Sequence, residues 1–137
     1  LLGELNYINT DLLLKGDAWT AETEVQELNK IDIGLMPLPD DEWAKGKCGL
    51  KGLTYMACGI ATVMSPVGVN KEIITHGQNG FLATTEEEWL NYLSQLIENK
   101  ELRLKLGEAG RQTVIEKYSV EANKEKYLLA FKSVLNA

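Results

Sequence analysis

Three lysines stand close together in a chain that is otherwise acidic. Lys45, Lys47 and Lys51 fall within seven residues, separated by two glycines, one cysteine and one leucine in the run KGKCGLK. A lysine ammonium neutralises an anion, and glycine lets the backbone approach that anion closely. A helix that begins here adds unpaired N–H groups to the same site. The pattern favours a diphosphate-binding loop, and its alternative is a solvated basic loop that balances the acidic residues 40–42.

Few other side chains in the sequence offer chemistry. With two cysteines and one histidine, the chain has too few ligands for a Cys/His metal site, and we expect no metal. Cys48 lies at a predicted helix start, but the sequence shows neither the base nor the second thiol that a nucleophilic or redox role would need. Cys58 is typical of a small core residue, and His76 of a surface turn.

Composition limits the class of protein and its partners. The 137 residues are enough for one domain, and 14 basic against 20 acidic residues give a net charge of −6. This balance argues against nucleic acid as a partner. The chain starts without methionine and has neither a signal-peptide pattern nor a membrane-length apolar run. We therefore expect a cytoplasmic protein, and a fragment of a longer one.

Short apolar runs alternate with stretches of helical period. The runs are apolar on both faces, which is typical of parallel strands joined by helices, so the sequence predicts an α/β doubly wound half. Thr20 is the expected N-cap of the first helix, and Gly59 is expected to end the second in the left-handed conformation. The predicted strands are 11–14, 31–38, 60–65 and 80–83, and the predicted helices are 20–29, 50–58 and 70–75.

The last third of the chain is expected to be helical. A capping box at Thr85–Glu88 opens one helix, a second covers about 101–117, and Ser119 caps a third. We expect their apolar stripes to face the core. The last helix, as the end of a fragment, is the one most able to pack on a neighbour outside the chain. The stripes are Trp89, Leu90, Leu93, Leu96 and Ile97; Leu102, Leu106, Ala109 and Val114; and Tyr127, Leu128, Phe131, Val134 and Leu135.

Ligands of doubly wound sheets bind outside the carboxyl ends of the strands. This rule indicates the loops at 16–20, 37–49 and 66–70. Trp19 and Trp43 lie in two of these loops, where each could stack on a base, the alternative being an ordinary half-buried tryptophan. Gly68, in a tight loop after a strand, is expected to line the crevice.

A longer stretch carries a family resemblance. The run KGKCGLKGLTYMACGIATVMSPVGVNKEIITHGQNGFLA (residues 45–83), preceded by IDIGLMPLPDD and followed by EKYS at 116–119, resembles the C-terminal lobe of family 4 glycosyltransferases. These are the retaining, group 1 transferases with the GT-B fold. The resemblance covers about residues 11–131, with several motifs in the same order. It implies a Rossmann-like parallel-sheet lobe that binds a nucleotide-sugar donor.

The resemblance also assigns site residues. Lys47 and Lys51 would bind the donor's phosphates, and the amides of Cys48, Gly49 and Leu50 would face the diphosphate and the sugar. The family motif has two glutamates seven residues apart. Their positions here are Gly46, near the donor sugar, and Thr54, at the ribose. A threonine hydroxyl is shorter than a carboxylate and neutral, so its presence is expected to weaken donor binding by about 1.5–3 kcal/mol.

The family's enzymes have two lobes, and the resemblance therefore implies partners. Residues 1–137 would be one C-terminal lobe that lacks the N-terminal lobe and its own first strand. The full-length parent would be a hexosyltransferase of polysaccharide synthesis that transfers sugar to a glycan or lipid-linked acceptor. Its expected place is the cytoplasm, with peripheral membrane contact through the N-terminal lobe. No cofactor besides the nucleotide-sugar substrate is implied, and the isolated fragment is expected to be inactive.

Two alternatives come from other classes of protein. Because Gly46 and Thr54 depart from the family motif, the chain could be a noncatalytic transferase-like lobe that serves as a scaffold. A phosphoacceptor receiver domain is the weaker alternative. Asp40 and Asp41 fit it poorly, because they follow prolines in a long loop instead of ending a strand.

Overall fold

The computed structural model describes residues 20–135. Its centre is a parallel sheet with the order β1 (Ile33–Met36), β2 (Ala61–Met64), β3 (Phe81–Leu82). Ile33 lies opposite Ala61, and Val63 lies opposite Phe81. The predicted parallel α/β fold is confirmed for this part of the chain. The predicted strand at 11–14 lies outside the described residues.

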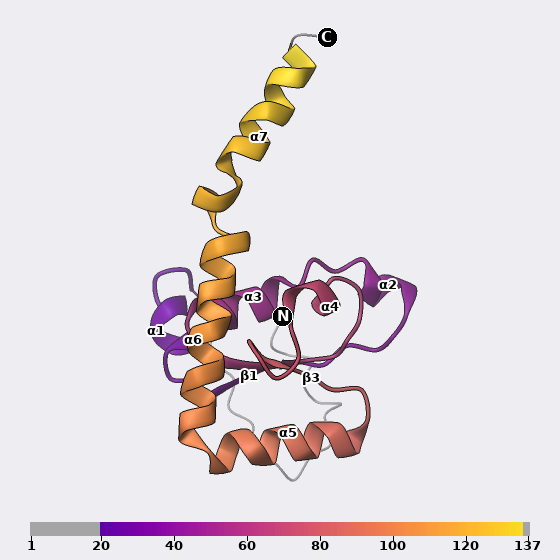
Figure 1. Ribbon diagram of the computed structural model, residues 1–137, viewed down its shortest axis with the longest axis vertical. Coiled ribbons are helices and arrows are strands. Elements are labelled where there is room, and N and C mark those ends of the chain that lie inside the picture. Colours follow the sequence, from indigo (N-terminus) through magenta and orange to yellow (C-terminus); the bar gives the residue numbers. More distant parts are fainter. Residues whose placement is uncertain (1–19, 136–137) are drawn as a thin grey trace.

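Helices cover both faces of the sheet. Figure 1 shows α5 on one side and α3 with α4 on the other, while α6 runs past the sheet and α7 continues beyond it. The element order agrees with the alternation of strands and helices that the sequence predicts, except for α2, which falls in a stretch predicted as loop. The helices are α1 (Glu24–Leu28), α2 (Glu42–Lys45), α3 (Leu50–Ala57), α4 (Asn70–Ile73), α5 (Glu86–Glu98), α6 (Lys100–Lys117) and α7 (Val120–Leu135).

The core has two parts, one on each face of the sheet. Successive residues of a strand point to opposite faces, so Val63 packs with α5 and the start of α6, while its neighbour Met64 packs with α3 and α4. The sheet is thus the middle of three layers. The first cluster contains Ala61, Val63, Phe81, Ala83, Leu96 and Leu106, and the second contains Met36, Met56, Met64, Ile73 and Ile74.

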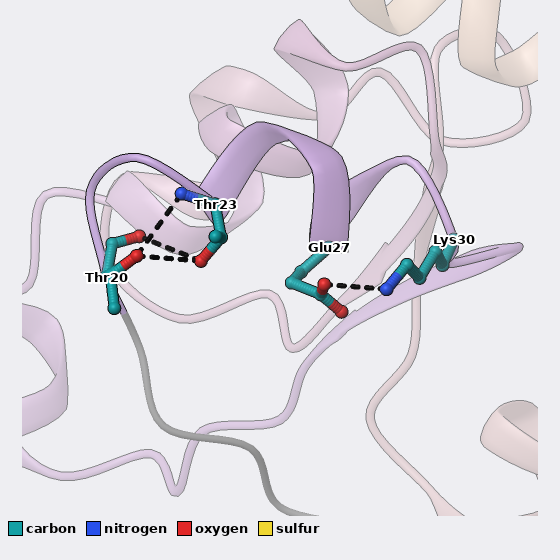
Figure 2. Close-up of polar contacts among 4 residues, drawn as sticks. All are labelled: Thr20, Thr23, Glu27 and Lys30. Carbon is teal, nitrogen blue, oxygen red and sulfur yellow. Dashed lines mark hydrogen bonds and ion pairs between the residues drawn. The ribbon is translucent and has the colours of Figure 1, made fainter.

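The first helix begins later than the sequence predicts. Figure 2 shows Thr20 and Thr23, whose hydroxyl oxygens lie 2.8 Å apart, and the Thr23 N–H donates to Thr20 Oγ1 over 3.3 Å. Thr20 therefore closes a separate turn, and Thr23 is the N-cap of α1. The short helix gains one exposed ion pair, Glu27 with Lys30, at 2.6 Å.

The helical third of the chain is confirmed in its caps but only partly in its buried faces. The capping box at Thr85 and Glu88 is present, and Ser119 Oγ accepts the Ala122 N–H at 3.0 Å. On α5, Leu96 is buried, whereas Leu90 and Ile97 are exposed, contrary to expectation. The prediction that the apolar stripe of the last helix faces the core is wrong for this chain, because α7 extends past the sheet. Its stripe, Tyr127, Leu128, Phe131, Val134 and Leu135, is exposed throughout.

Candidate functional site

The loop after β1 contains a short helix that orders the lysine cluster. Asp41 caps α2 by accepting the Ala44 N–H at 2.7 Å. Lys45, in the last turn, pairs with Glu42 at 2.9 Å and with Asp40 at 3.5 Å. The Glu42 hydrogen bond and then the Asp40 charge raise the pKa of Lys45. Lys45 therefore belongs to the acidic side of the loop, as the solvated-loop interpretation expects of it.

A pocket with a volume of about 620 Å³ opens at the carboxyl edge of the sheet. The volume is in the usual range for small-molecule sites. All five residues predicted to hold the diphosphate and sugar, and Gly46, contribute to its wall, so the structure brings them together. The described lining residues are Leu35, Met36, Pro37, Leu38, Gly46, Lys47, Cys48, Gly49, Leu50 and Lys51.

The start of α3 supplies the polar part of this pocket. Gly49, its N-cap, has φ = 70°, a left-handed conformation that favours glycine, and no side chain caps the first turn. Helix N-terminal N–H groups without side-chain partners bind anions well. Lys47 and Lys51 are exposed and line the same pocket, and neither forms an ion pair with another residue between 20 and 135. The result is a cationic opening.

Two glycines let α3 lie very close to the sheet. A Cβ on Gly52 would collide with the end of the Met64 side chain, and one on Gly34 of β1 would come within 2.5 Å of the Tyr55 ring. This close packing partly buries Tyr55, and the burial raises the pKa of its hydroxyl. The N-terminus of α3 is therefore fixed by tight contacts farther along the helix.

The expected ribose position is engaged within its own helix. Thr54 Oγ1 donates its proton to the Leu50 carbonyl oxygen at 2.9 Å. Thr54 is not among the described residues that line the pocket. Only the lone pairs of the hydroxyl are left for a ligand, so a ribose would have to donate to Thr54 without a carboxylate's charge.

The remaining predicted residues lie around this pocket or beyond the described residues. Trp19 lies outside the described residues. Trp43 is 82% exposed on α2 and does not line the pocket. Gly68, with φ = 53°, packs behind the lysine loop, where a Cβ would stand 2.6 Å from the Lys45 carbonyl oxygen. Gly68 therefore supports the pocket wall from outside instead of lining the pocket.

Sequence reasoning placed Pro37 and Leu38 in a ligand loop but did not assign Leu35 and Met36, the strand part of the apolar wall, to the pocket. Residues 35–38 end β1 and start its following loop, and Leu35 is 40% exposed although it lies in a strand. The sequence did contain a signal for these residues. The predicted strand 31–38 leads into the predicted ligand loop 37–49, so its last residues must lie at the ligand-binding edge of the sheet. The pocket thus has one apolar wall and one cationic wall.

His76 lies in a surface turn, as predicted, and belongs to a separate aromatic group with Phe81 and Tyr92. Its Nδ1 accepts the Leu82 N–H at 3.1 Å. Nearby, Glu88 accepts hydrogen bonds from the Thr84 and Thr85 N–H groups, which lower the pKa of its carboxyl. These contacts join β3 to the start of α5, and none of these residues lines the pocket.

The layers and the placement of the pocket define a class of protein. A parallel sheet with helices on both faces and a pocket at its carboxyl edge is the arrangement of Rossmann-like α/β lobes. Residues 22–113 match the family described as glycosyl transferases group 1. The chain belongs to this family, and its fold matches GT-B glycosyltransferase C-terminal domains.

Three known proteins illustrate the similarity. The N-acetyl-alpha-D-glucosaminyl L-malate synthase of Bacillus anthracis is 31% identical over 93 residues, which are 66% of this chain and 24% of that protein. The C-terminal domain of a glycosyl transferase group 1 family protein (LpcC) from Francisella tularensis has a TM-score of 0.64 and 25% identity. The match covers 77% of this chain and 53% of the LpcC chain.

The third similar protein was solved with a ligand. Anabaena Alr3699/HepE in complex with UDP has a TM-score of 0.62 and 20% identity, over 79% of this chain and 29% of that one. At this identity the likeness shows the fold. This chain thus spans about a quarter to a half of the proteins it resembles.

The described residues provide neither a metal-binding cluster nor a membrane-spanning helix. Between residues 20 and 135, no cluster of three or more histidine, cysteine or acidic side chains is arranged to hold a metal ion. Over the same residues, no helix has both the length and the apolar character needed to cross a membrane.

Proposed function

We propose that this chain is the donor-binding lobe of a retaining glycosyltransferase, with the pocket beside α3 as the site for a nucleoside-diphosphate sugar. The observation that carries this proposal is the cationic wall of the pocket. Lys47 and Lys51 flank the uncapped start of α3, and neither has an ion-pair partner among residues 20–135. Charge-assisted hydrogen bonds from such groups suit a diphosphate.

Each part of the pocket has a proposed role. The two lysines bind phosphate oxygens, while the amides of Cys48, Gly49 and Leu50 face the diphosphate and the donor sugar. The apolar wall at 35–38 packs against the nucleoside. As the sugar leaves, negative charge builds on the diphosphate, and the lysines with the α3 dipole stabilise it. This role needs no metal ion.

The comparisons support the same class of ligand. The Anabaena HepE structure, whose fold this chain shares, was solved with UDP. The Bacillus anthracis relative is an N-acetyl-alpha-D-glucosaminyl L-malate synthase. For the full-length parent we propose transfer of a hexose to a glycan or lipid-linked acceptor in polysaccharide synthesis. We place it in the cytoplasm, with membrane contact through an N-terminal lobe, and expect no turnover from residues 1–137 alone.

One observation favours a second function. Thr54 stands where the family has a ribose-binding glutamate, and its hydroxyl proton is used by Leu50. A lobe that no longer binds a nucleotide-sugar donor would serve as a noncatalytic scaffold. The two functions differ in one measurable property, which is affinity for a nucleoside diphosphate.

Calorimetric titration of the chain with UDP, GDP and ADP tests the proposal. We expect at least one to bind with a millimolar or tighter Kd. The double variant Lys47→Ala/Lys51→Ala should bind that ligand about 10- to 100-fold more weakly, because it removes charge-assisted hydrogen bonds. The matched control, Lys126→Ala/Lys132→Ala on α7, removes the same charge far from the pocket and should stay within about twofold. Equal losses in both variants would indicate unspecific attraction, and no binding of any diphosphate would favour the scaffold.

A further inference from the structure

The two walls of the pocket come from separate stretches of chain and need a link to stay in place. The apolar wall ends at Leu38, and the cationic wall includes Gly49 at the start of α3. Apolar packing behind them, mainly Met36, Met56 and Met64, holds the layers together. Packing of flexible methionines adapts easily and sets no direction. Hydrogen bonds are directional, so the polar groups behind the pocket are the natural candidates for the link.

Ser65 makes the first half of this link. It follows β2 directly and is buried. Its Oγ accepts the Leu38 N–H at 2.9 Å, and its own N–H donates to the Met36 carbonyl at 3.1 Å. Ser65 thus continues the pairing of β1 and β2 beyond the sheet and fixes the course of the apolar wall.

Asn70 makes the second half. It begins α4, is 1% exposed, and its Nδ2 donates to the Ser65 carbonyl at 2.9 Å. On its other side Asn70 contributes to the packing of α4 against the start of α3, because a Cβ on Gly49 would stand 2.4 Å from Ile73 Cδ1 and 3.2 Å from Asn70 Oδ1. The buried side-chain amide of Asn70 therefore lies between the end of β2 and Gly49, the N-cap residue of α3.

We propose that Ser65 and Asn70 are positioning residues that set the separation of the two pocket walls for a nucleoside diphosphate. Neither residue lines the pocket. They act through Leu38 on one wall and Gly49 on the other. This inference rests on the proposed function, since it concerns the ligand of the same pocket.

The chain provides a matched control in Asn79. This second buried asparagine is 6% exposed, and its side chain bonds to Thr75, Ile73 and Thr113 at 2.7, 3.0 and 3.0 Å. It too joins a loop to a helix, and none of these partners lines the pocket. Its bond to Ile73 is to the backbone carbonyl, whereas the neighbour of Gly49 is the Ile73 side chain. Loss of Asn79 should therefore lower stability without altering the pocket.

The test measures the thermal midpoint Tm of Asn70→Ala, Ser65→Ala and Asn79→Ala and their Kd for UDP, or for GDP or ADP if the wild type binds that diphosphate more tightly. We expect Asn70→Ala and Ser65→Ala to weaken diphosphate binding about tenfold. Asn79→Ala should lower Tm at least as much while its Kd stays within about twofold. Ser65→Thr keeps the hydroxyl and should restore binding. In the absence of ligand, the Leu38 amide proton of Ser65→Ala should shift upfield in NMR spectra, because its acceptor is gone.

The outcomes separate this inference from the function on which it rests. If the wild type binds one of these diphosphates and the folded Ser65→Ala and Asn70→Ala variants bind it equally well, the positioning role is wrong and the donor site stands. The same holds if Asn79→Ala weakens binding as much as Asn70→Ala does. If the wild type binds no diphosphate, the donor site is wrong, and the positioning role falls with it. If Asn70→Ala does not fold, the comparison of diphosphate binding between Ser65→Ala and Ser65→Thr tests the positioning role in the same way.

Discussion

The strands and helices behind the pocket and the last helix were all predicted from apolar patterns, yet the two regions differ completely in burial. Behind the pocket, Met64, Ile73 and Asn70 are each at most 2% exposed. Along the 16 residues of α7, no residue is buried, and Phe131 is 67% exposed. An apolar stripe shows which face of an element avoids water. It does not show which partner covers that face.

The largest expected effect tests this contrast in stability. Met64→Ala removes a fully buried side chain beneath α3, so it should lower the free energy of unfolding by about 2–5 kcal/mol. Phe131→Ala on α7 removes a larger side chain that is mostly exposed, and should change stability by no more than about 0.5 kcal/mol. Urea unfolding of both variants measures the difference. Similar losses would mean that α7 is packed in solution.

A second effect concerns the loop behind the lysine wall. Gly68 and Gly77 both have positive φ, 53° and 75°, so alanine is strained at either by about 1–2 kcal/mol. Only at Gly68 would the new Cβ meet backbone, the Lys45 carbonyl, whereas Gly77 has nothing within 4 Å. Gly68→Ala should therefore destabilise the protein clearly more than Gly77→Ala in thermal unfolding. Equal Tm losses in the two variants would show that Gly68 is not in close contact with the Lys45 backbone.

The sequence predicted much of the fold because its signals are local. The apolar runs around Ile33–Met36 and Ala61–Met64, the capping box at Thr85 and the turn at Gly59 each act within a few residues. The helix α2 was missed although Asp41 caps it, because prolines and acidic residues around it resemble a loop. The lysine cluster and its helix start were found in the same local way.

Features that depend on distant residues could not be read from the sequence. Gly107, in the middle of α6, is unfavourable for a helix by itself, and its reason is the Gly59 carbonyl that a Cβ would strike. The bonds from Ser65 to Leu38 and from Asn70 to Ser65 likewise appear only in three dimensions. The exposure of the α7 stripe also depends on what packs around it and not on its own pattern.

A smaller expected effect concerns recognition of the ribose at Thr54. Thr54 donates its hydroxyl proton to the Leu50 carbonyl and does not line the pocket. The pocket should therefore discriminate only weakly between a ribose and a 2′-deoxyribose. UDP and 2′-deoxy-UDP should bind within about twofold of each other, and Thr54→Val should not change that ratio. Competition titrations measure it. A preference for UDP of about tenfold or more would show that Thr54 contacts the ribose after all.

The smallest expected effect is a pH dependence at the start of α5. Hydrogen bonds from the Thr84 and then the Thr85 N–H lower the pKa of Glu88 below its usual value. Because the folded pKa is lower than the unfolded one, near 4.3, the stabilisation is complete above the unfolded pKa and is lost as pH falls through the folded pKa. Glu88→Gln should therefore lose less stability than the wild type between about pH 6 and about pH 3 in thermal unfolding. Identical pH profiles would contradict the capping role.

Amide-resolved NMR titration with UDP, GDP and ADP tests the central claim most directly, because it reports both binding and its location. We expect shifts centred on residues 47–51 and the facing wall at 35–38, with α7 unchanged as an internal reference. The Kd values obtained from the titration curves would rank the three bases. A well-folded spectrum in which no diphosphate moves these amides, or in which α7 moves as much as they do, would contradict the donor-site account.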